Sequence, residues 1–221
     1  MNFTFGIITN GSEVDRVSEM VRFIEDAVIE DDHDYYTEIL IVGGDFPEHL
    51  EDLRVPIYHV PFGEATKKNW ITRKKNLITE AATCENVVYM HDYIKICVGW
   101  FKGFRKFGSN WDVAMNPILT LDGSRYRDWV IWDDPDYEGT PQTALPPYTY
   151  NKTQFMYISG AYWVAKREFM IANPFNEDLS WGQGEDVEWS KRVRSNWNYS
   201  FNPDSQVQLM KKKEVISRRC Y

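Results

Sequence analysis

The chain is organised around the stretch Trp181-Gly182-Gln183-Gly184-Glu185-Asp186-Val187-Glu188-Trp189. Two glycines loosen the backbone beside an indole, and three carboxylates, those of Glu185, Asp186 and Glu188, follow within four residues. The next residues continue in a helical pattern, so the acids fall in the first turn of a helix, where the helix dipole stabilises negative charge. A glycine loop followed by a charged helix start is therefore one interpretation of the stretch.

Capping a helix leaves Trp181 unexplained. An exposed indole can stack on the face of a sugar ring, and a neighbouring carboxylate can accept the proton of a hydroxyl group. Transfer to a carbohydrate hydroxyl requires both groups. The second interpretation is therefore a site where Trp181 contacts a sugar and one of the acids acts as a base.

The composition is that of one globular domain, with 221 residues of which 43% are hydrophobic and 26% charged. The formal net charge of −8 argues against a nucleic-acid partner, because binding a phosphate backbone needs an extended cationic surface. The chain has 9 Trp and 13 Tyr, many of them among polar residues. Sugar faces are one use for so many aromatic rings.

The cysteines and the N-terminus indicate the compartment. Three cysteines are odd in number and lack metal-like spacing, which favours free thiols over a disulfide framework or a zinc site. The N-terminal residues show neither a basic region nor a long apolar stretch. We therefore expect no signal peptide or transmembrane anchor, and a cytoplasmic location.

The first sixty residues predict the opening of a parallel α/β sheet. The expected elements are a strand over residues 3–8, an amphipathic helix over 14–28, and strands over 38–42 and 56–60. The first strand ends in Thr9-Asn10-Gly11 and the second in Gly43-Gly44-Asp45. Ligands bind beyond the carboxyl ends of such strands, so we expect Thr9, Asn10 and Asp45 to share a site. Plain turns are the alternative.

A helix over residues 67–83 and a strand over 86–90 come next, with the run Arg73-Lys74-Lys75-Asn76 on the helix. A solvated basic face is the structural interpretation of these cations. The strand ends in His91-Asp92-Tyr93. A carboxylate in that position is one kind of ligand for a hard cation.

Aromatic residues mark the second half. Residues 99–107 carry rings at helical spacing, which indicates a core stripe, and a strand is expected over 111–115. A long aromatic stretch then runs to Tyr150. Its length and rings predict a mobile lid over residues 125–150, with Trp129 or Trp132 stacking on an acceptor. Residues 155–164 predict another strand, and 206–210 a final one.

The stretch 181–189 resembles the tryptophan- and glycine-rich loop and the Gly-Glu-Asp signature of inverting glycosyltransferases with the GT-A fold, as in β-1,4-galactosyltransferases and many family 2 members. The resemblance covers nearly the whole chain in order. It implies a single α/β domain, residues 1–221, with a mixed, mostly parallel sheet flanked by helices. A nucleotide-sugar half would span about 1–98 and an acceptor half about 99–221.

The same resemblance implies a role for each matching residue. Asp186 would be the general base, and Glu185 would hold a neighbouring acceptor hydroxyl. Asp92, with help from His91, would hold Mn²⁺ or Mg²⁺ against the diphosphate, although His91-Asp92-Tyr93 has only one carboxylate where the family has Asp-X-Asp. The implied contacts to the donor are Arg73, Lys75 and Asn76 to the nucleotide and Gly160 beneath the sugar.

The last eleven residues are strongly basic, with Lys211-Lys212-Lys213 and Arg218-Arg219. Three interpretations stay open: a solubilising tail, a peripheral contact with a membrane surface, and, by the resemblance, a segment that covers the diphosphate.

Together these features predict a metal-dependent, inverting hexosyltransferase that uses a UDP-sugar donor and a carbohydrate or glycoconjugate acceptor. A sugar nucleotidyltransferase would begin with a Gly-rich, Arg-Lys-containing loop, which residues 9–12 do not match. A binding domain without catalysis is a further alternative, supported by the single carboxylate at Asp92. Glycoside hydrolysis also uses paired carboxylates but leaves the nucleotide half unused.

Overall fold

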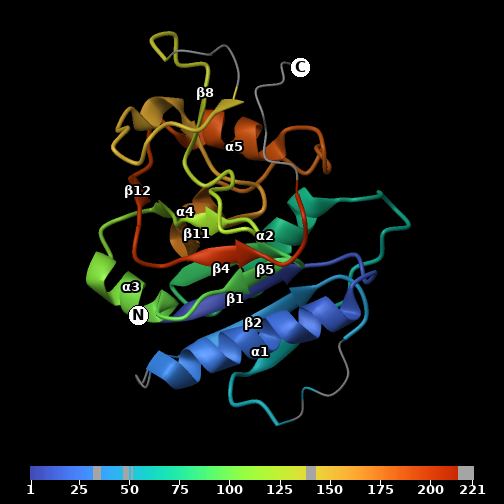
Figure 1. Ribbon diagram of the computed structural model, residues 1–221. Helices are drawn as coiled ribbons and strands as arrows, with labels where there is room; N and C mark the ends of the chain where they lie inside the picture. The colour runs from blue at the N-terminus through green and yellow to red at the C-terminus, as the bar shows by residue number, and fades with distance from the viewer. Residues whose placement is uncertain (32–35, 47–49, 51, 138–142, 214–221) are drawn as a thin grey trace.

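A seven-stranded mixed sheet forms the centre of the protein in a computed structural model that describes residues 1–31, 36–46, 50, 52–137 and 143–213 (Figure 1). Its strands are β1 (Phe3–Ile8), β2 (Thr37–Val42), β3 (Ile57–Val60), β4 (Asn86–His91), β6 (Val113–Met115), β11 (Tyr162–Lys166) and β12 (Tyr199–Phe201). They are ordered β12-β6-β11-β4-β1-β2-β3, and β11 is antiparallel to both neighbours. The expected mixed, mostly parallel sheet is confirmed.

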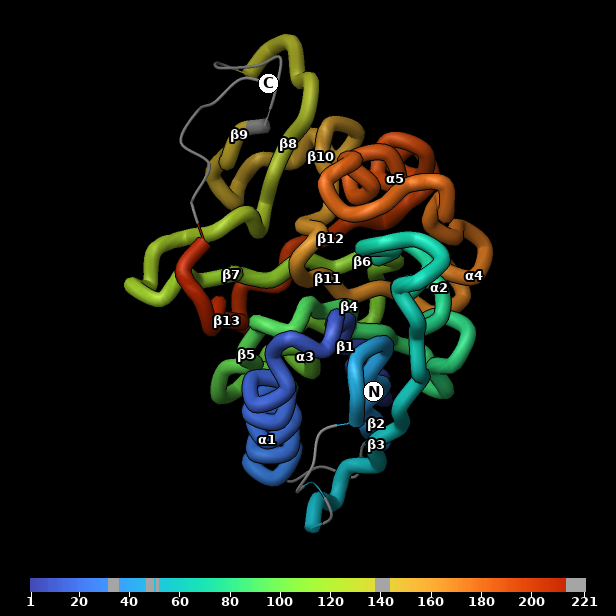
Figure 2. Tube along the Cα trace, turned by 90° about the vertical axis from the view of Figure 1, so that its right-hand side faces the viewer, coloured from blue at the N-terminus to red at the C-terminus, as the bar shows by residue number. Residues whose placement is uncertain are grey.

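Helices cover both faces of this sheet (Figures 1 and 2). They are α1 (Val14–Asp31), α2 (Ile71–Ala81), α3 (Trp100–Phe107), α4 (Arg167–Ala172) and α5 (Glu185–Val193), with a short 3-10 turn, η1 (Thr153–Phe155). Helices α1 and α3 contact each other on one face, and α2 and α4 contact each other on the other. The sheet is therefore covered by helices, and every residue of β1 and β2 is buried.

Strand β1 shows how the alternation of side chains serves both faces. Phe3 and Phe5 pack on the ring of Trp100 in α3, with ring centroids 4.9 and 5.2 Å away. Gly6 points the opposite way, against Ile78 of α2. The aromatic stripe of α3 is therefore core, as its spacing predicts.

Two small sheets complete the domain. One pairs β5 (Ile94–Ile96), β13 (Val207–Leu209) and β7 (Ile118–Leu119), and the other pairs β10 (Met156–Tyr157), β8 (Val130–Trp132) and β9 (Thr143–Ala144). The expected lid segment thus contributes two strands to an antiparallel sheet instead of forming a structureless loop. Residues 138–142 of that segment lie outside the described part of the chain.

Two expected elements have different bounds. The helix expected from residue 67 begins at Ile71, because Asn69 has φ of 55° and its carbonyl accepts from the Ile71 N–H. The strand expected over 155–164 is divided into β10 and β11 by a turn that contains Gly160. The first change moves Arg73 into the first turn of α2, and the second frees the backbone of Gly160 for other contacts.

A substitution at Gly103 of α3 tests how closely this helix packs against the turn at residues 204–205. A Cβ there would lie 2.5 Å from the carbonyl oxygen of Asp204. Gly→Ala in a helix is normally stabilising by about 1 kcal/mol, yet we expect Gly103→Ala to lower the free energy of unfolding by roughly 1–3 kcal/mol. Denaturant unfolding measures the change.

Lys102→Ala, at an exposed position one residue earlier in α3, is the matched control and should stay within about 0.5 kcal/mol of wild type. Stabilisation by Gly103→Ala would show that the 204–205 turn moves aside at no cost.

Candidate active site

A cleft lies at the carboxyl ends of β1 and β4, which pair in parallel with Ile8 opposite His91. The residue after each strand turns into it: the Thr9 hydroxyl donates to Asp92 Oδ2 at 2.9 Å. Thirteen residues line the cleft, namely Ile8, Thr9, Asn10, Glu64, Asn69, Ile71, Lys74, His91, Asp92, Tyr93, Trp181, Lys211 and Lys213. Thr9, Asn10, His91, Asp92 and Trp181 are thus brought together from three distant parts of the sequence.

The two glycine turns meet beside this cleft. A Cβ on Gly44 would lie 2.7 Å from the Cα of Gly11, so the backbones touch. Asp45 follows at an exposed position. The expectation that both turns lie at one edge of the sheet is confirmed, and contact between Asp45 and a donor stays a proposal.

His91 is a neutral imidazole at physiological pH. Burial, followed by the charges of Lys75, Lys213 and Lys211, lowers its pKa to about 3. Its ring also forms a hydrogen bond with the backbone of Gly160. A neutral imidazole beside Asp92 has a lone pair to offer a cation or a hydroxyl group.

Glu185 forms a buried ion pair with Lys75. The Lys75 Nζ lies 3.1 Å from Glu185 Oε1, and the two side chains are 0% and 8% exposed. Nζ also lies 4.8 and 4.9 Å from the ring centroids of Trp163 and Phe175. Lys75 was expected to contact the nucleotide and Glu185 an acceptor hydroxyl. In the structure the two side chains bind each other.

Asp186 is held by two backbone N–H groups at the start of α5. Gly160 N–H donates to Oδ2 at 3.2 Å and Val187 N–H to Oδ1 at 2.9 Å. Burial and then the Glu185 charge raise the pKa of Asp186, while the charges of Lys75 and Arg127 oppose the rise. Glu188 is turned elsewhere and pairs with Arg192 at 3.1 Å.

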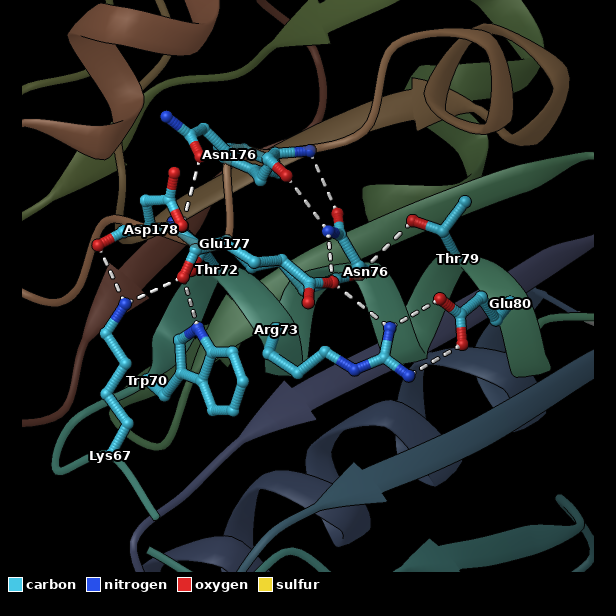
Figure 3. A network of polar contacts seen from close by, with 12 residues as sticks. Lys67, Trp70, Thr72, Arg73, Asn76, Thr79, Glu80, Asn176, Glu177 and Asp178 are labelled. Atoms are coloured by element: carbon cyan, nitrogen blue, oxygen red, sulfur yellow. Dashed lines mark hydrogen bonds and ion pairs between the residues drawn. The ribbon is translucent and has the colours of Figure 1, made fainter.

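Arg73 and Asn76 serve a different purpose from the one expected (Figure 3). The Asn76 amide donates to the Phe175 carbonyl at 3.0 Å and to Glu177 Oε1 at 2.8 Å, and it accepts from the Phe175 N–H at 2.9 Å. Arg73 donates to Glu80 and Glu177. Both side chains bind the segment before Trp181 instead of lining the cleft, which corrects the expectation of nucleotide contact.

The three candidate tryptophans have three different environments. Trp129 is 3% exposed, stacks on Tyr199 at 5.0 Å and donates to the Tyr150 carbonyl, so the expectation that it stacks on an acceptor is wrong. Trp132 is half-buried under the Lys191 ammonium. Trp181 is 62% exposed at the cleft. Trp181 has a ring face to offer a ligand.

Three further lysines, Lys74, Lys211 and Lys213, line the cleft. Lys74 donates to the Thr9 carbonyl at 2.7 Å and pairs with Glu64, and only its helical phase separates it from Lys75. Lys211 and Lys213 lie 4.3 and 4.6 Å above the Tyr93 ring. They bring the start of the basic segment to the cleft, and Arg218 and Arg219 lie outside the described residues.

The donor set suits a cation that is bound chiefly through its substrate. Within the described ranges, no three His, Cys, Asp or Glu side chains gather closely enough to hold a metal by themselves. Asp92 and His91 supply an oxygen and a nitrogen at the cleft. Mg²⁺ is commonly held by one or two carboxylates together with substrate phosphates and water, and this smaller set fits that pattern.

No helix among the described residues has the length and apolarity to cross a membrane.

Solved structures share this architecture. GalNAc-T7, crystallised with UDP, GalNAc and Mn²⁺, aligns with a TM-score of 0.67 and 14% identity over 96% of this chain and 44% of its own. S. aureus TarS 1-349, in complex with UDP-GlcNAc, aligns with a TM-score of 0.63 and 13% identity over 100% of this chain and 62% of its own. The chain has the GT-A fold. It spans between 37% and 62% of the length of such structures.

No protein-family profile and no curated protein sequence matches the chain. The likeness therefore concerns the GT-A fold, at identities of 12–14%. The function has to be argued from the residues of this chain.

The two roles considered for Asn76 predict different results. We expect Asn76→Ala to lower the free energy of unfolding by about 1–3 kcal/mol, because it leaves the buried backbone groups of Phe175 without partners. Arg73→Ala removes only partly exposed ion pairs, so about 1 kcal/mol or less is expected. Thermal and denaturant unfolding measure both.

The UDP affinity of both variants is then measured by calorimetry, at a temperature where both are folded. It should be unchanged in Arg73→Ala. A large loss of UDP binding in this variant with no loss of stability would restore the nucleotide role.

Proposed function

We propose that the protein is a glycosyltransferase that moves a sugar from a nucleoside-diphosphate sugar, a UDP-sugar, to a hydroxyl group of a carbohydrate. The observation that carries the proposal is the position of Gly160 between the two ends of the site. Its backbone hydrogen-bonds the His91 ring, and its N–H binds Asp186. A donor whose diphosphate binds at His91 and Asp92 would therefore lie within reach of the Asp186 carboxylate.

The environment of Tyr93 supports this arrangement. Burial raises the pKa of Tyr93, and Tyr126, Asp92 and Glu185 add to the rise, so charges from both halves of the chain act on one hydroxyl. In this proposal residues of about 1–98 bind the donor and residues of about 99–221 the acceptor. Trp181, exposed at the junction, would stack on a sugar ring.

The residues at the carboxyl ends of β1 and β4 would hold the leaving group. Asp92 and His91 would bind Mn²⁺ or Mg²⁺, which neutralises charge on the diphosphate. Lys74, Lys211 and Lys213 line the same cleft and add positive potential for an anionic leaving group. Asn10 and Asp45 would lie on the nucleoside side.

Asp186 would be the base. In a single displacement, the acceptor oxygen attacks the anomeric carbon, the bond from that carbon to the diphosphate oxygen breaks, and the hydroxyl proton passes to Asp186. The nucleoside diphosphate leaves with the bonding electrons, and the configuration at the anomeric carbon inverts. Burial, which raises the Asp186 pKa, makes the carboxylate a stronger base than an exposed aspartate.

The proposal is tested by incubating the protein with Mn²⁺ and a panel of nucleotide sugars, with and without candidate acceptor glycans. Release of nucleoside diphosphate that depends on an acceptor is the expected result. A protein that binds a nucleotide sugar but never turns it over would be a binding domain instead.

Asp186→Asn should lower kcat at least about a hundredfold, within the range that general-base catalysis contributes. The affinity for the donor and the unfolding temperature should be close to those of wild type. Because the base must be ionised, kcat/KM should fall as the pH drops through its pKa, and burial places that fall above the ordinary value of 3.8. Glu188→Gln is the matched control with near wild-type kcat, since Glu188 pairs with Arg192. Retention of a tenth of the activity by Asp186→Asn would assign the base elsewhere.

Asp92→Asn should weaken UDP binding in Mn²⁺ by about tenfold or more, a loss comparable with that caused by removing an outer partner of a metal ligand. A chelator should weaken UDP binding to wild type by a similar factor and add little in the variant. Calorimetric titration with UDP measures all four affinities. Asp26→Asn, on the exposed face of α1, is the control. Equal affinities with and without chelator in wild type would remove the metal from the proposal.

A further inference from the structure

Arg127 lies beside Asp186 without an anionic partner. It belongs to the segment between β7 and β8, and its guanidinium donates to the Tyr157 hydroxyl at 3.2 Å and also hydrogen-bonds the Tyr126 side chain. Both partners are neutral hydroxyl groups. Among the described residues, no carboxylate forms an ion pair with it. Tyr157 lies three residues before Gly160, whose N–H donates to Asp186, so the guanidinium binds the segment that leads to this contact. Burial lowers the pKa of Arg127, but the Tyr157 hydroxyl and the Asp186 charge raise it, and the rise is larger.

Arg125, two residues earlier, shows what a structural arginine looks like in the same segment. It donates to Asp128 Oδ1 at 2.6 Å, to the Pro146 carbonyl at 2.7 Å and to the Trp129 carbonyl at 3.1 Å. Three acceptors, one of them the buried Asp128 carboxylate, account for its charge and most of its donors. Arg127 has no comparable set.

Arg127 is half-buried, and a buried guanidinium usually has a carboxylate partner or a full set of hydrogen bonds that offsets the loss of hydration. The Asp186 charge acts on Arg127, but no ion pair joins them among the described residues, and the two Asp186 oxygens already accept from Gly160 and Val187. A planar, forked guanidinium is suited to bind two oxygens of a carboxylate or a phosphate. Its unused donors therefore match an anion that comes from outside the chain.

We infer that Arg127 binds a carboxylate or phosphate group carried by the acceptor, so that the acceptor is an acidic or phosphorylated carbohydrate. The inference rests on the proposed function for the role of acceptor. The location favours the acceptor over the donor diphosphate, since Lys74, Lys211 and Lys213 line the cleft at β1 and β4 and Arg127 is not among the described residues that line it. The hydroxyl to be glycosylated would face Asp186 while the anion binds Arg127.

The test measures affinity for small anions and for their neutral counterparts, by saturation-transfer NMR on UDP-saturated protein. Glycerol 3-phosphate is compared with glycerol, and glucuronate with glucose, so the two pairs distinguish phosphate from carboxylate. Wild type should bind at least one anion about ten times more tightly than its neutral counterpart, the gain expected from charge-assisted hydrogen bonds. Arg127→Gln should abolish that preference, and Arg127→Lys, which keeps the charge and loses the fork, should retain part of it.

Arg125→Gln is the matched control. It should lower the unfolding temperature, because it removes the ion pair with the buried Asp128 carboxylate and two hydrogen bonds to carbonyl groups, and it should keep the preference for the anion. The unfolding temperature of Arg127→Gln shows whether loss of binding reflects loss of fold.

Three outcomes would overturn the inference. Wild type could show no preference for either anion, the preference could survive in Arg127→Gln, or Arg127→Gln could weaken UDP instead, which would assign the guanidinium to the donor. Failure of the proposed function is a separate result: no nucleotide sugar would turn over, while a preference for the anion that depends on Arg127 would persist.

Discussion

The buried ion pair between Lys75 and Glu185 is the interaction on which the site depends. It joins the middle of α2 to the first residue of α5, two elements that are 110 positions apart in the sequence. Removing one member of such a pair strands the other charge and typically costs about 3–5 kcal/mol. Burial raises the pKa of Asp186 and lowers that of His91, and the Lys75 charge opposes the first shift and adds to the second. One cation therefore fixes the start of α5 and favours both the ionised carboxylate and the neutral imidazole.

Three consecutive residues of helix α2 contact three different parts of the molecule. Lys74 reaches the Thr9 carbonyl at the end of β1, Lys75 reaches Glu185, and Asn76 reaches Phe175. Successive side chains on a helix are turned by about 100°, so a run of polar residues can bind a strand end, a helix start and a loop at once. The glycine loop and α5 are positioned from this one helix, which explains how a carboxylate late in the chain meets a strand end from its first half.

Local pattern was sufficient for the framework and for the ends of its strands. Sequence pattern predicted β1, β2 and β4, and the rule for parallel sheets predicted that the turn after β1 lies beside the turn after β2, where Gly11 and Gly44 touch. The errors concern side chains whose partners are distant in the sequence. Asn76 binds a segment about 100 positions away, and Trp129 is buried by Tyr199 and Tyr150. Arg127 lies in no recognisable motif, and it differs from Arg125 in having no ion pair within the part of the chain that the structure describes, whereas Arg125 binds Asp128.

Gly160 sets a limit on how such a protein can diversify. A Cβ at this position would lie 3.0 Å from Asp186 Oδ2 and 3.3 Å from Glu185 Oε1, so any other residue would press on the acids it now contacts through its backbone. The centre of the site is thus built from main chain, which substitution cannot tune. Adaptation to a new ligand has to come from the periphery, through exposed rings such as Trp181 and through the segment that carries Arg127. Related proteins with different ligands should therefore differ at the rim of the cleft and agree at its centre.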